Sequence, residues 1–370
     1  LKDPSVFKEI FPFDFITEAV DQSRGWFYSL LYTSVLLHGD VAFKACVSQE
    51  HVLDEDGGKM SKSKGNVVWA KDAFDDLGAD PFRMYMLTRS ASWTRTNYSP
   101  KQIELTRRNL DILWNVVLFA ETYMELDEFN YDEKRMLTNL DKAEMEDRWL
   151  LSRVQSVLKE FHKHMDKYLW HLAGRVLLEF ISEDLSRVYL PLVKKRVWLD
   201  ADNPKKVMAY DTLLYALDTI LRCLNIFTPF LGEYMYQHFL DRFSTDGLES
   251  INMTEMPQSS DSLFDSEIEA AFHVLQELRS ASSHARNKKG LKLRHPVAKV
   301  MLIPTSDEVG QRALSLSEIL LEDLNTRQFE VLDSDVVSEF IDLKVKPNYQ
   351  KLGPKYKDKM KDLVRVLQET

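Results

Sequence analysis

A succession of amphipathic helical stripes between Pro100 and about Leu240 is the feature that most constrains the fold of this chain. Within each stripe, apolar residues recur every three or four positions, which places them on one face of an α-helix. Consecutive long helices with no strand-like segment between them predict an antiparallel all-α bundle. Pro191 is expected to close the third stripe, and Pro229 interrupts the stretch after the fourth. The stripes consist of Leu110, Leu113, Trp114, Val117 and Met124; Leu151, Val154, Leu158, Phe161 and Met165; Leu177, Ile181, Leu185 and Val188; and Leu213, Leu217, Leu221 and Leu224.

The residues before the bundle predict a mixed α/β region. Residues 1–99 combine short β-type runs with loops that contain glycine, and Ala42–Val47 is interpreted as a short buried strand. Gly78 and Pro81 interrupt the chain before an apolar helix expected over Phe82–Leu87.

The residues after the bundle alternate between helical and strand-like patterns. Residues 244–263 are rich in Ser, Thr, Asp and Gly, a composition typical of a linker. The alternation beyond it predicts a small α/β unit. We therefore expect three domains, at residues 1–99, 100–255 and 256–370. The patterns of the last domain are a helix over Ile268–Leu278, a strand over Val297–Ile303, a helix near Leu314–Leu324, and strands near Phe329–Leu332 and Phe340–Val345.

Two properties of the composition exclude whole classes of protein. No stretch of about 18 uncharged apolar residues occurs, because the most apolar segment, Leu213–Leu231, contains Asp218 and Arg222. A membrane span is therefore excluded. The two cysteines, Cys46 and Cys223, lie too far apart in the sequence to supply a four-cysteine zinc site or a disulfide framework. We therefore expect no zinc or other resident metal, and a reducing, cytoplasmic location.

The net charge conceals a local basic stretch. Lys and Arg number 48 against 58 Asp and Glu, and the resulting net charge of −10 argues against nucleic-acid binding at the level of bulk charge. Between Arg279 and Ser306, however, there is no acidic residue. A run of this kind is usually a solvated face, although phosphate groups also bind to such patches. The first residue is Leu1 rather than Met, so we expect a piece of a longer protein.

The loop Asp54–Asn66, with the sequence DEDGGKMSKSKGN, is the most informative segment for function. Two glycines before its lysines and one after them make the backbone mobile, and three lysines alternate with small or flexible residues. A flexible cationic loop can close over phosphates and stabilise the charge that builds on a leaving pyrophosphate. The pattern by itself leaves a solvated surface loop as the alternative.

The segment Phe15–Phe27, with the sequence FITEAVDQSRGWF, is the second candidate. Asp21 and Gln22 are adjacent polar residues shortly before an apolar run in the sequence. A carboxylate and an amide at a strand end can hydrogen-bond a ribose diol. Residue type alone is equally compatible with Asp21 as a helix N-cap and Trp26 as a core aromatic.

The two segments resemble elements of one known family. KMSKS followed by KGN resembles the signature loop of class I aminoacyl-tRNA synthetases. FITEAVDQSRGWF is similar to the Glu-Gly-x-Asp-Gln-His-Arg-Gly-Trp-Phe element of isoleucyl-tRNA synthetases, which lies upstream of that loop in a Rossmann-type domain. The resemblance implies that Lys59 and Lys62 are catalytic and stabilise the transition state that carries the pyrophosphate. The residues implied to hold the aminoacyl-adenylate are Glu18, Asp21, Gln22 and Trp26.

Three positions depart from the family pattern. The family's glycine is Ala19, whose methyl group would crowd a close backbone contact. The histidine after the glutamine is Ser23, to which no role is carried over. The histidine often found ten residues before the signature lysine is Gln49, and we expect it to bind substrate because a glutamine can still hydrogen-bond ribose or phosphate.

The resemblance extends through the rest of the chain. Asp147–Arg153 and Leu185–Leu190 are similar to helices of the anticodon-binding bundle shared by the Ile, Val, Leu and Met enzymes. Gly290–Pro296 and Pro347–Lys355 fit isoleucyl enzymes of archaeal and eukaryotic type better than valyl enzymes. In this context we expect tRNA to bind to the basic residues Arg286, Lys288, Lys289, Lys292 and Arg294.

The fold implied is the C-terminal half of a Rossmann-type α/β catalytic domain, then an all-α anticodon-binding bundle, then a small α/β domain. In the implied reaction, L-isoleucine and ATP form an adenylate, and the acyl group passes to the tRNA for isoleucine. ATP is a substrate accompanied by Mg²⁺, and a monomer is expected. No His-x-Gly-His element occurs, and the family places it far upstream, so this chain alone is expected to be inactive. The alternatives are a valyl-tRNA synthetase fragment and a non-catalytic tRNA-binding module.

Overall fold

Two units make up the protein in the computed structural model, which describes residues 4–200, 202–243, 248–333, 352 and 357–359. The division falls between Glu269 and Ala270, inside a long helix. None of the described helices combines the length and the apolar character that a bilayer crossing requires.

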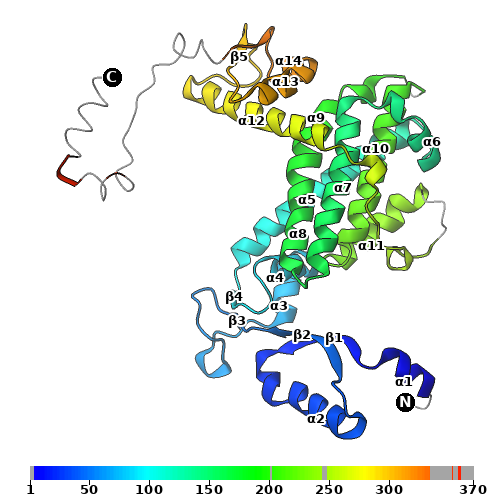
Figure 1. The fold of residues 1–370 in the computed structure, drawn as a ribbon, viewed down its shortest axis with the longest axis vertical. Helices are drawn as coiled ribbons and strands as arrows, with labels where there is room; N and C mark the ends of the chain where they lie inside the picture. Colours follow the sequence, from blue (N-terminus) through cyan, green and yellow to red (C-terminus); the bar gives the residue numbers. More distant parts are fainter. Residues whose placement is uncertain (1–3, 201, 244–247, 334–351, 353–356, 360–370) are drawn as a thin grey trace. The chain divides into compact units, whose positions relative to one another are not determined.

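The first unit begins with two parallel strands and a helical crossover (Figure 1). Its elements are α1 (Pro4–Ile10), β1 (Phe13–Ala19), the 3-10 turn η1 (Val20–Arg24), α2 (Trp26–His38) and β2 (Phe43–Gln49). Parallel strands cannot be joined by a tight turn, so the chain between β1 and β2 carries η1 and α2. Ala19 lies opposite Gln49 in the register. Both strands therefore end at the same edge.

Shorter elements connect this strand pair to the bundle. They are β3 (Val52–Leu53), η2 (Lys62–Lys64), α3 (Ala70–Leu77), α4 (Ala79–Thr88) and β4 (Thr96–Asn97), and β3 pairs in parallel with β4. Gly78 separates α3 from α4 with a φ of 86°, a backbone conformation that favours glycine. The predicted break at this point is confirmed, although the helix begins three residues earlier than expected.

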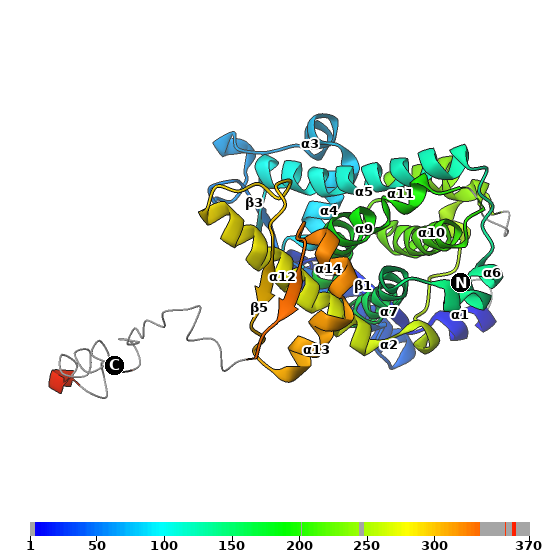
Figure 2. The same cartoon turned by 90° about the horizontal axis from the view of Figure 1, so that it is seen from above.

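The bundle follows, and Figure 1 shows its long helices α5, α7, α8 and α10 side by side. Its elements are α5 (Pro100–Leu126), α6 (Glu133–Thr138), η3 (Leu140–Lys142), α7 (Met145–Met165), α8 (Trp170–Glu179), the π-helical η4 (Phe180–Tyr189), α9 (Leu190–Val193), η5 (Arg196–Trp198), α10 (Pro204–Leu224) and α11 (Pro229–His238). The predicted stripes supply much of its core, since Leu113, Val154, Leu185 and Leu217 are all 0% exposed, but Trp114 of the first stripe is 43% exposed and not part of the core. Seen from above in Figure 2, α5 passes along one side of α10 and α11.

Pro191 does not end the third helix, contrary to the sequence-based expectation. The helix continues as η4 and then as α9, and Pro191 occupies the first turn of α9. A proline in a first turn removes a donor that has no partner within that turn. The chain therefore runs helically to Val193.

Buried ion pairs hold one end of the bundle. Arg196 donates through Nη2 to Asp147 Oδ2 at 2.7 Å and through Nη1 to Glu146 Oε1 at 2.9 Å. Tyr189 Oη donates to Asp147 Oδ1 at 2.9 Å. Burial is the largest influence on the Asp147 carboxyl and raises its pKa, while the nearby Arg196 opposes this rise. Loss of either charged partner would leave the other buried without compensation.

The segment expected to be a linker packs against the bundle where it is described. Residues 248–263 contain η7 (Ile251–Met253) and η8 (Asp261–Leu263), after η6 (Leu240–Arg242). Ile251 and Leu263 are buried there, and Ser250 Oγ accepts from Asn252 N–H at 3.1 Å. The small polar residues therefore cap short turns instead of forming an extended connection.

The second unit contains most of α12 (Ser266–Lys288), then β5 (Val300–Leu302), α13 (Asp307–Ser315), α14 (Ser317–Asp323), β6 (Phe329–Val331) and η10 (Lys357–Lys359). β5 pairs in parallel with β6. The helix expected near residues 314–324 is two helices, because the backbone changes direction at Leu316, with φ −103° and ψ 14°. The strand expected near Phe340–Val345 lies outside the described residues, as does most of Pro347–Lys355.

Candidate functional site

The carboxyl edge of the β1–β2 pair gathers several of the predicted site residues. Glu18 is the penultimate residue of β1, and Gln49 ends β2. Gln49 Nε2 donates to Thr17 Oγ1 at 2.9 Å, and Thr17 Oγ1 donates to the Val47 carbonyl at 2.9 Å. The Gln49 amide is therefore held against β1. In open α/β sheets ligands bind outside this edge.

Gln22 links the strand edge to the following helix. Its Oε1 accepts from Trp26 N–H at 3.0 Å, and its Nε2 donates to Asp21 Oδ2 at 3.2 Å. A Cβ at Gly25 would lie 2.7 Å from Gln22 Oε1, so a larger residue there would displace the end of the Gln22 side chain. Gln22 thus orients the Asp21 carboxylate and satisfies a donor at the start of α2.

The interpretations of Asp21 as a helix N-cap and of Trp26 as a core aromatic are both wrong. Asp21 lies within η1, and the residue that precedes α2 is Gly25, so Asp21 is not a helix N-cap. Trp26 is 43% exposed and therefore not a core aromatic. Ala19 has φ −70° and ψ 156°, an ordinary extended conformation, so alanine fits there without backbone strain.

The loop Asp54–Asn66, which we call the signature loop, is held closed at its base by Asp54 and Asn66. Gly58 N–H donates to Asp54 Oδ1 at 2.6 Å, and Asn66 Nδ2 donates to Asp54 Oδ2 at 2.7 Å. Asn66 Oδ1 accepts from Ser61 N–H at 2.9 Å. The Asn66 bond, followed by that from Gly58, lowers the pKa of the Asp54 carboxyl. Sequence reasoning missed this pair, whose only signal was an Asp and an Asn at the two ends of a glycine-rich loop.

The two lysines predicted to be catalytic project from this closed loop. Lys59 and Lys62 are both exposed, and neither forms an ion pair with a carboxylate in the described part of the chain. Lys62 Nζ lies 5.4 Å from the centre of the Trp69 ring. Gly65 closes the turn after them in the left-handed conformation, with φ 66°. Both ammonium groups are therefore available to an anionic ligand.

The predicted tRNA-binding residues lie at the end of α12 and in the turn after it, and one of them is misassigned. Lys288, Lys289, Lys292 and Arg294 are exposed. Arg286 is only 5% exposed and donates to backbone carbonyl oxygens, among them those of His295 at 2.7 Å and Leu324 at 2.8 Å. The prediction that Arg286 binds RNA is therefore wrong, because its guanidinium is enclosed by the fold. We call Lys288–His295 the basic turn.

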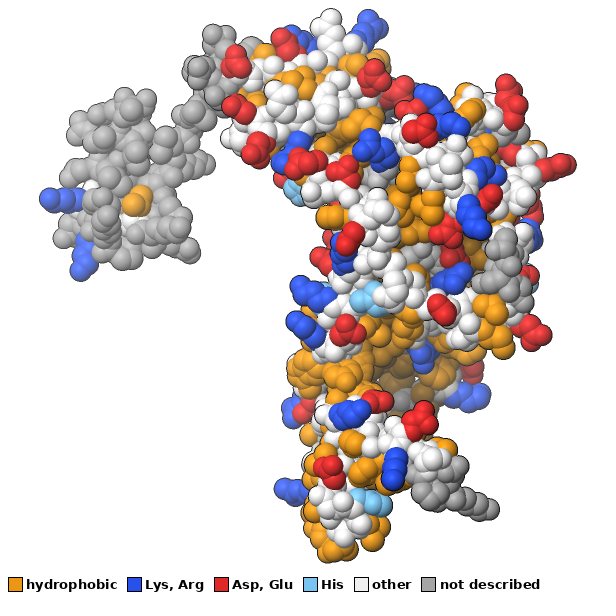
Figure 3. All heavy atoms as spheres, turned by 45° about the vertical axis from the view of Figure 1, so that its right-hand side comes forward, with side chains coloured by type: hydrophobic (Ala, Val, Ile, Leu, Met, Phe, Trp, Pro, Cys, Tyr) orange, Lys and Arg blue, Asp and Glu red, His pale blue; other side chains and the backbone are white. Residues whose placement is uncertain are grey.

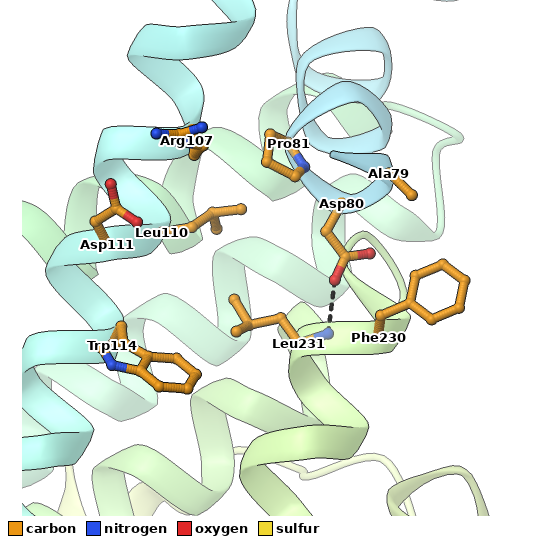
Figure 4. A pocket seen from close by; sticks show the side chains of 9 residues that line it. All are labelled: Ala79, Asp80, Pro81, Arg107, Leu110, Asp111, Trp114, Phe230 and Leu231. Carbon is orange, nitrogen blue, oxygen red and sulfur yellow. Dashed lines mark hydrogen bonds between the residues drawn. The ribbon is translucent and has the colours of Figure 1, made fainter. Parts of the chain in front are cut away.

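A cavity of about 450 Å³ lies between α4, α5 and α11 (Figure 4). Its lining is mainly apolar and includes Trp114 and Phe230. Asp80, 7% exposed, accepts from Leu231 N–H at 2.6 Å through Oδ2, and its Oδ1 has no hydrogen-bond partner. Burial raises the pKa of this carboxyl. Asp80 caps the start of α11, so we assign it a structural role.

No group of three or more His, Cys, Asp or Glu side chains arranged to hold a metal ion occurs among the described residues. In the first unit, the predicted site residues lie at the edge of β1 and β2 and in the signature loop; in the second unit, they lie at the end of α12 and in the basic turn.

Comparison with known proteins relates these groups to two families. Residues 2–98 match the family model of class I tRNA synthetases (I, L, M and V), and residues 147–302 match the anticodon-binding domain of tRNA ligases. The second match begins in the bundle and ends with β5 of the second unit.

Individual relatives match nearly the whole chain. The isoleucine–tRNA ligase of Archaeoglobus fulgidus is 39% identical over 98% of this chain and 34% of its own length. Those of Methanosarcina acetivorans and Pyrococcus furiosus are 38% and 37% identical over 98% and 96% of this chain. The chain spans about a third of the length of these relatives.

One solved structure has a similar fold at low sequence identity. It is the ternary complex of Agrobacterium radiobacter K84 agnB2 LeuRS with tRNA and LeuAMS, with a TM-score of 0.55 and 18% identity. The similarity covers 72% of this chain and 32% of that one.

Proposed function

We propose that this chain forms part of an isoleucine–tRNA ligase, because residues 2–98 match the family model of class I tRNA synthetases (I, L, M and V) and isoleucine–tRNA ligases match almost its whole length. The whole enzyme would couple L-isoleucine with ATP to give an adenylate and pyrophosphate, and then transfer the acyl group to the tRNA for isoleucine. The observation that carries this proposal is the signature loop, whose base is closed while Lys59 and Lys62 remain exposed.

The proposed chemistry of the loop is electrostatic. The isoleucine carboxylate would attack the α-phosphorus of ATP, and negative charge would build on the departing pyrophosphate. Lys59 and Lys62 would stabilise that charge as two point charges, which requires position but no proton transfer. No nucleophilic side chain is needed, because the substrate carboxylate and then the tRNA hydroxyl are the attacking groups. Mg²⁺ would enter with ATP, since this ion is usually bound through substrate phosphates and few carboxylates.

The edge of β1 and β2 would hold the adenylate. Glu18, Asp21 and Gln22 offer carboxylate and amide groups to its ammonium group and ribose, while Trp26 offers an exposed ring to the amino-acid side chain. Gln49 already donates to Thr17, which leaves its Oε1 to accept from a ribose hydroxyl.

The rest of the chain would bind tRNA. We propose that the all-α bundle recognises the anticodon region and that Lys288, Lys289, Lys292 and Arg294 contact tRNA phosphates. The proposed order is a catalytic part over residues 1–99, the bundle over 100–255 and a small α/β domain over 256–370. A monomer acting in the cytoplasm, where such enzymes serve translation, completes the proposal.

A chimaera tests the catalytic part. The segment of the Archaeoglobus fulgidus enzyme that matches this chain is replaced by this chain, and isoleucine-dependent exchange of pyrophosphate into ATP is measured. We expect exchange, with a loss of about 10²–10³-fold for K59A and for K62A. K71A is the matched control, because Lys71 is an exposed lysine paired with Asp75 nearby and should have no effect. Equal activity of all three variants would contradict the proposed role of the loop.

Filter binding tests the tRNA part and the rival functions. The isolated chain is titrated with transcripts of the tRNAs for isoleucine and for valine over a range of salt concentrations. We expect tighter binding of the isoleucine tRNA, whereas preference for the valine tRNA would indicate a valyl enzyme. Weak and equal binding of both would leave only a generic charged surface.

A further inference from the structure

Arg286 lies beside the proposed tRNA-binding residues, yet it faces the interior of the second unit. Its Nη1 donates to the carbonyl oxygens of His295 at 2.7 Å and Lys292 at 3.4 Å. Its Nη2 donates to the carbonyl of Leu324 at 2.8 Å and that of Asn325 at 3.3 Å. One guanidinium thus joins the basic turn to the end of α14, and its partners are all backbone oxygens.

A second residue joins the same two segments. Asn325, with φ 45°, follows α14 and donates through Nδ2 to the Leu293 carbonyl at 2.8 Å. In addition, Leu291 N–H donates to the Arg286 carbonyl at 2.9 Å. The backbone of the basic turn is therefore held at four residues, Leu291, Lys292, Leu293 and His295.

The charged side chains of the basic turn are accessible to solvent. Lys288, Lys289, Lys292 and Arg294 are exposed and have no ion pair with any described carboxylate. An exposed loop normally loses conformational freedom when a ligand orders it, and a loop already held in place avoids that cost. The arrangement therefore presents preorganised cations to a polyanion.

We propose that Arg286 is a positioning residue for RNA binding: it fixes the basic turn so that the four exposed cations meet successive phosphates of the tRNA backbone. This inference depends on the proposed tRNA-binding function. Lysine cannot replace Arg286, because a single ammonium group lacks the planar fork that reaches two segments at once. A residue that contacted phosphate directly would, in contrast, tolerate lysine.

The test compares R286K with K289Q and N325G in the full chain. K289Q is the matched control, because it removes one exposed cation and no contact that holds the turn. N325G removes the second side-chain link and retains a residue suited to positive φ, so it repeats the test should R286K fail to fold. Binding of the isoleucine tRNA transcript over a salt series is measured together with amide hydrogen exchange of residues 289–295 in the free protein.

For R286K and N325G we expect faster exchange in residues 289–295 and about tenfold weaker tRNA binding. For K289Q we expect unchanged hydrogen exchange. The slope of the logarithm of the binding constant against the logarithm of the salt concentration should become smaller by up to about one unit, because one phosphate contact is lost. Binding by R286K equal to that of the unmodified chain would overturn the inference, whether or not exchange changes. Absence of salt-dependent binding by the unmodified chain would overturn the proposed function itself, and with it this role for Arg286.

Discussion

Arg286 and Lys289 lie three positions apart in the same acid-free stretch, but one faces the interior and the other faces solvent. The sequence pattern predicted the same role for both, because it records charge and spacing only. What separates them is the convergence of the His295 and Leu324 carbonyls on one point, which depends on how α14 packs. Residue types therefore predicted the patch, whereas tertiary hydrogen bonds decide which members reach solvent.

The two cysteines give a prediction at this scale. Cys223 is 0% exposed, and burial raises the pKa of its thiol to about 12, whereas Cys46 is exposed. Because the thiolate is the reactive form, an alkylating reagent at mildly alkaline pH should modify Cys46 alone in the native protein. Mass spectrometry of native and denatured samples checks this, with C46S as the control that should remain unmodified until it is unfolded. Rapid native labelling of Cys223 would contradict its burial.

At the scale of elements, the periodic helices were the most predictable part of the fold. A stripe of leucines identifies a helix wherever one face is buried, as in α7 and α10. Helix ends were less predictable, as the continuation past Pro191 illustrates, because an end depends on local capping and on neighbouring elements. The residues of the signature loop were predicted by resemblance, but the Asp54–Asn66 contact that closes it is a geometric feature that residue types do not reveal.

That contact yields a prediction for the loop. In N66D, a carboxylate replaces the amide that donates to Asp54 Oδ2, so the donor is lost and two negative charges face each other. Loss of this hydrogen bond to a charged group should raise the open population of the loop. Trypsin cleavage after Lys59, Lys62 and Lys64 measures this opening. S63A, which alters a loop hydroxyl without touching Asp54, should be cleaved at the original rate.

Asp80 yields a prediction for the junction of α4 and α11. D80A removes the acceptor of Leu231 N–H, and we expect the free energy of unfolding to fall by about 1–3 kcal/mol. D80N retains a side-chain oxygen that can accept this hydrogen bond, so its free energy of unfolding should fall less than that of D80A. D111A is the control, because Asp111 lines the same cavity but is exposed and should change stability by no more than about 0.5 kcal/mol. Urea unfolding followed by circular dichroism measures all three, and a D80A variant as stable as D111A would contradict the capping role.

At the scale of the whole molecule, exposed apolar surface is unevenly distributed. The described residues of the first unit expose many large hydrophobic side chains, and Figure 3 shows them around a hollow in the lower half of the view. The helix α2 contributes Tyr28, Tyr32, Val35, Leu36 and Leu37, each more than half exposed. Clusters of exposed apolar side chains commonly mark a contact surface or a site of self-association.

The apolar face of α2 gives the last prediction. Leu36 and Leu37 are 69% and 68% exposed, so the double variant L36K/L37K should leave the free energy of unfolding within about 0.5 kcal/mol of the original. It should also reduce any concentration-dependent self-association of the isolated chain, because water-exposed apolar area is replaced by charge. L113A, at a position that is 0% exposed in the bundle core, is the contrasting variant and should lose about 2–5 kcal/mol. Light scattering and chemical unfolding measure the two effects separately. A double variant as unstable as L113A would mean that this face of α2 is packed within the chain, and unchanged self-association would place the contact surface on another element.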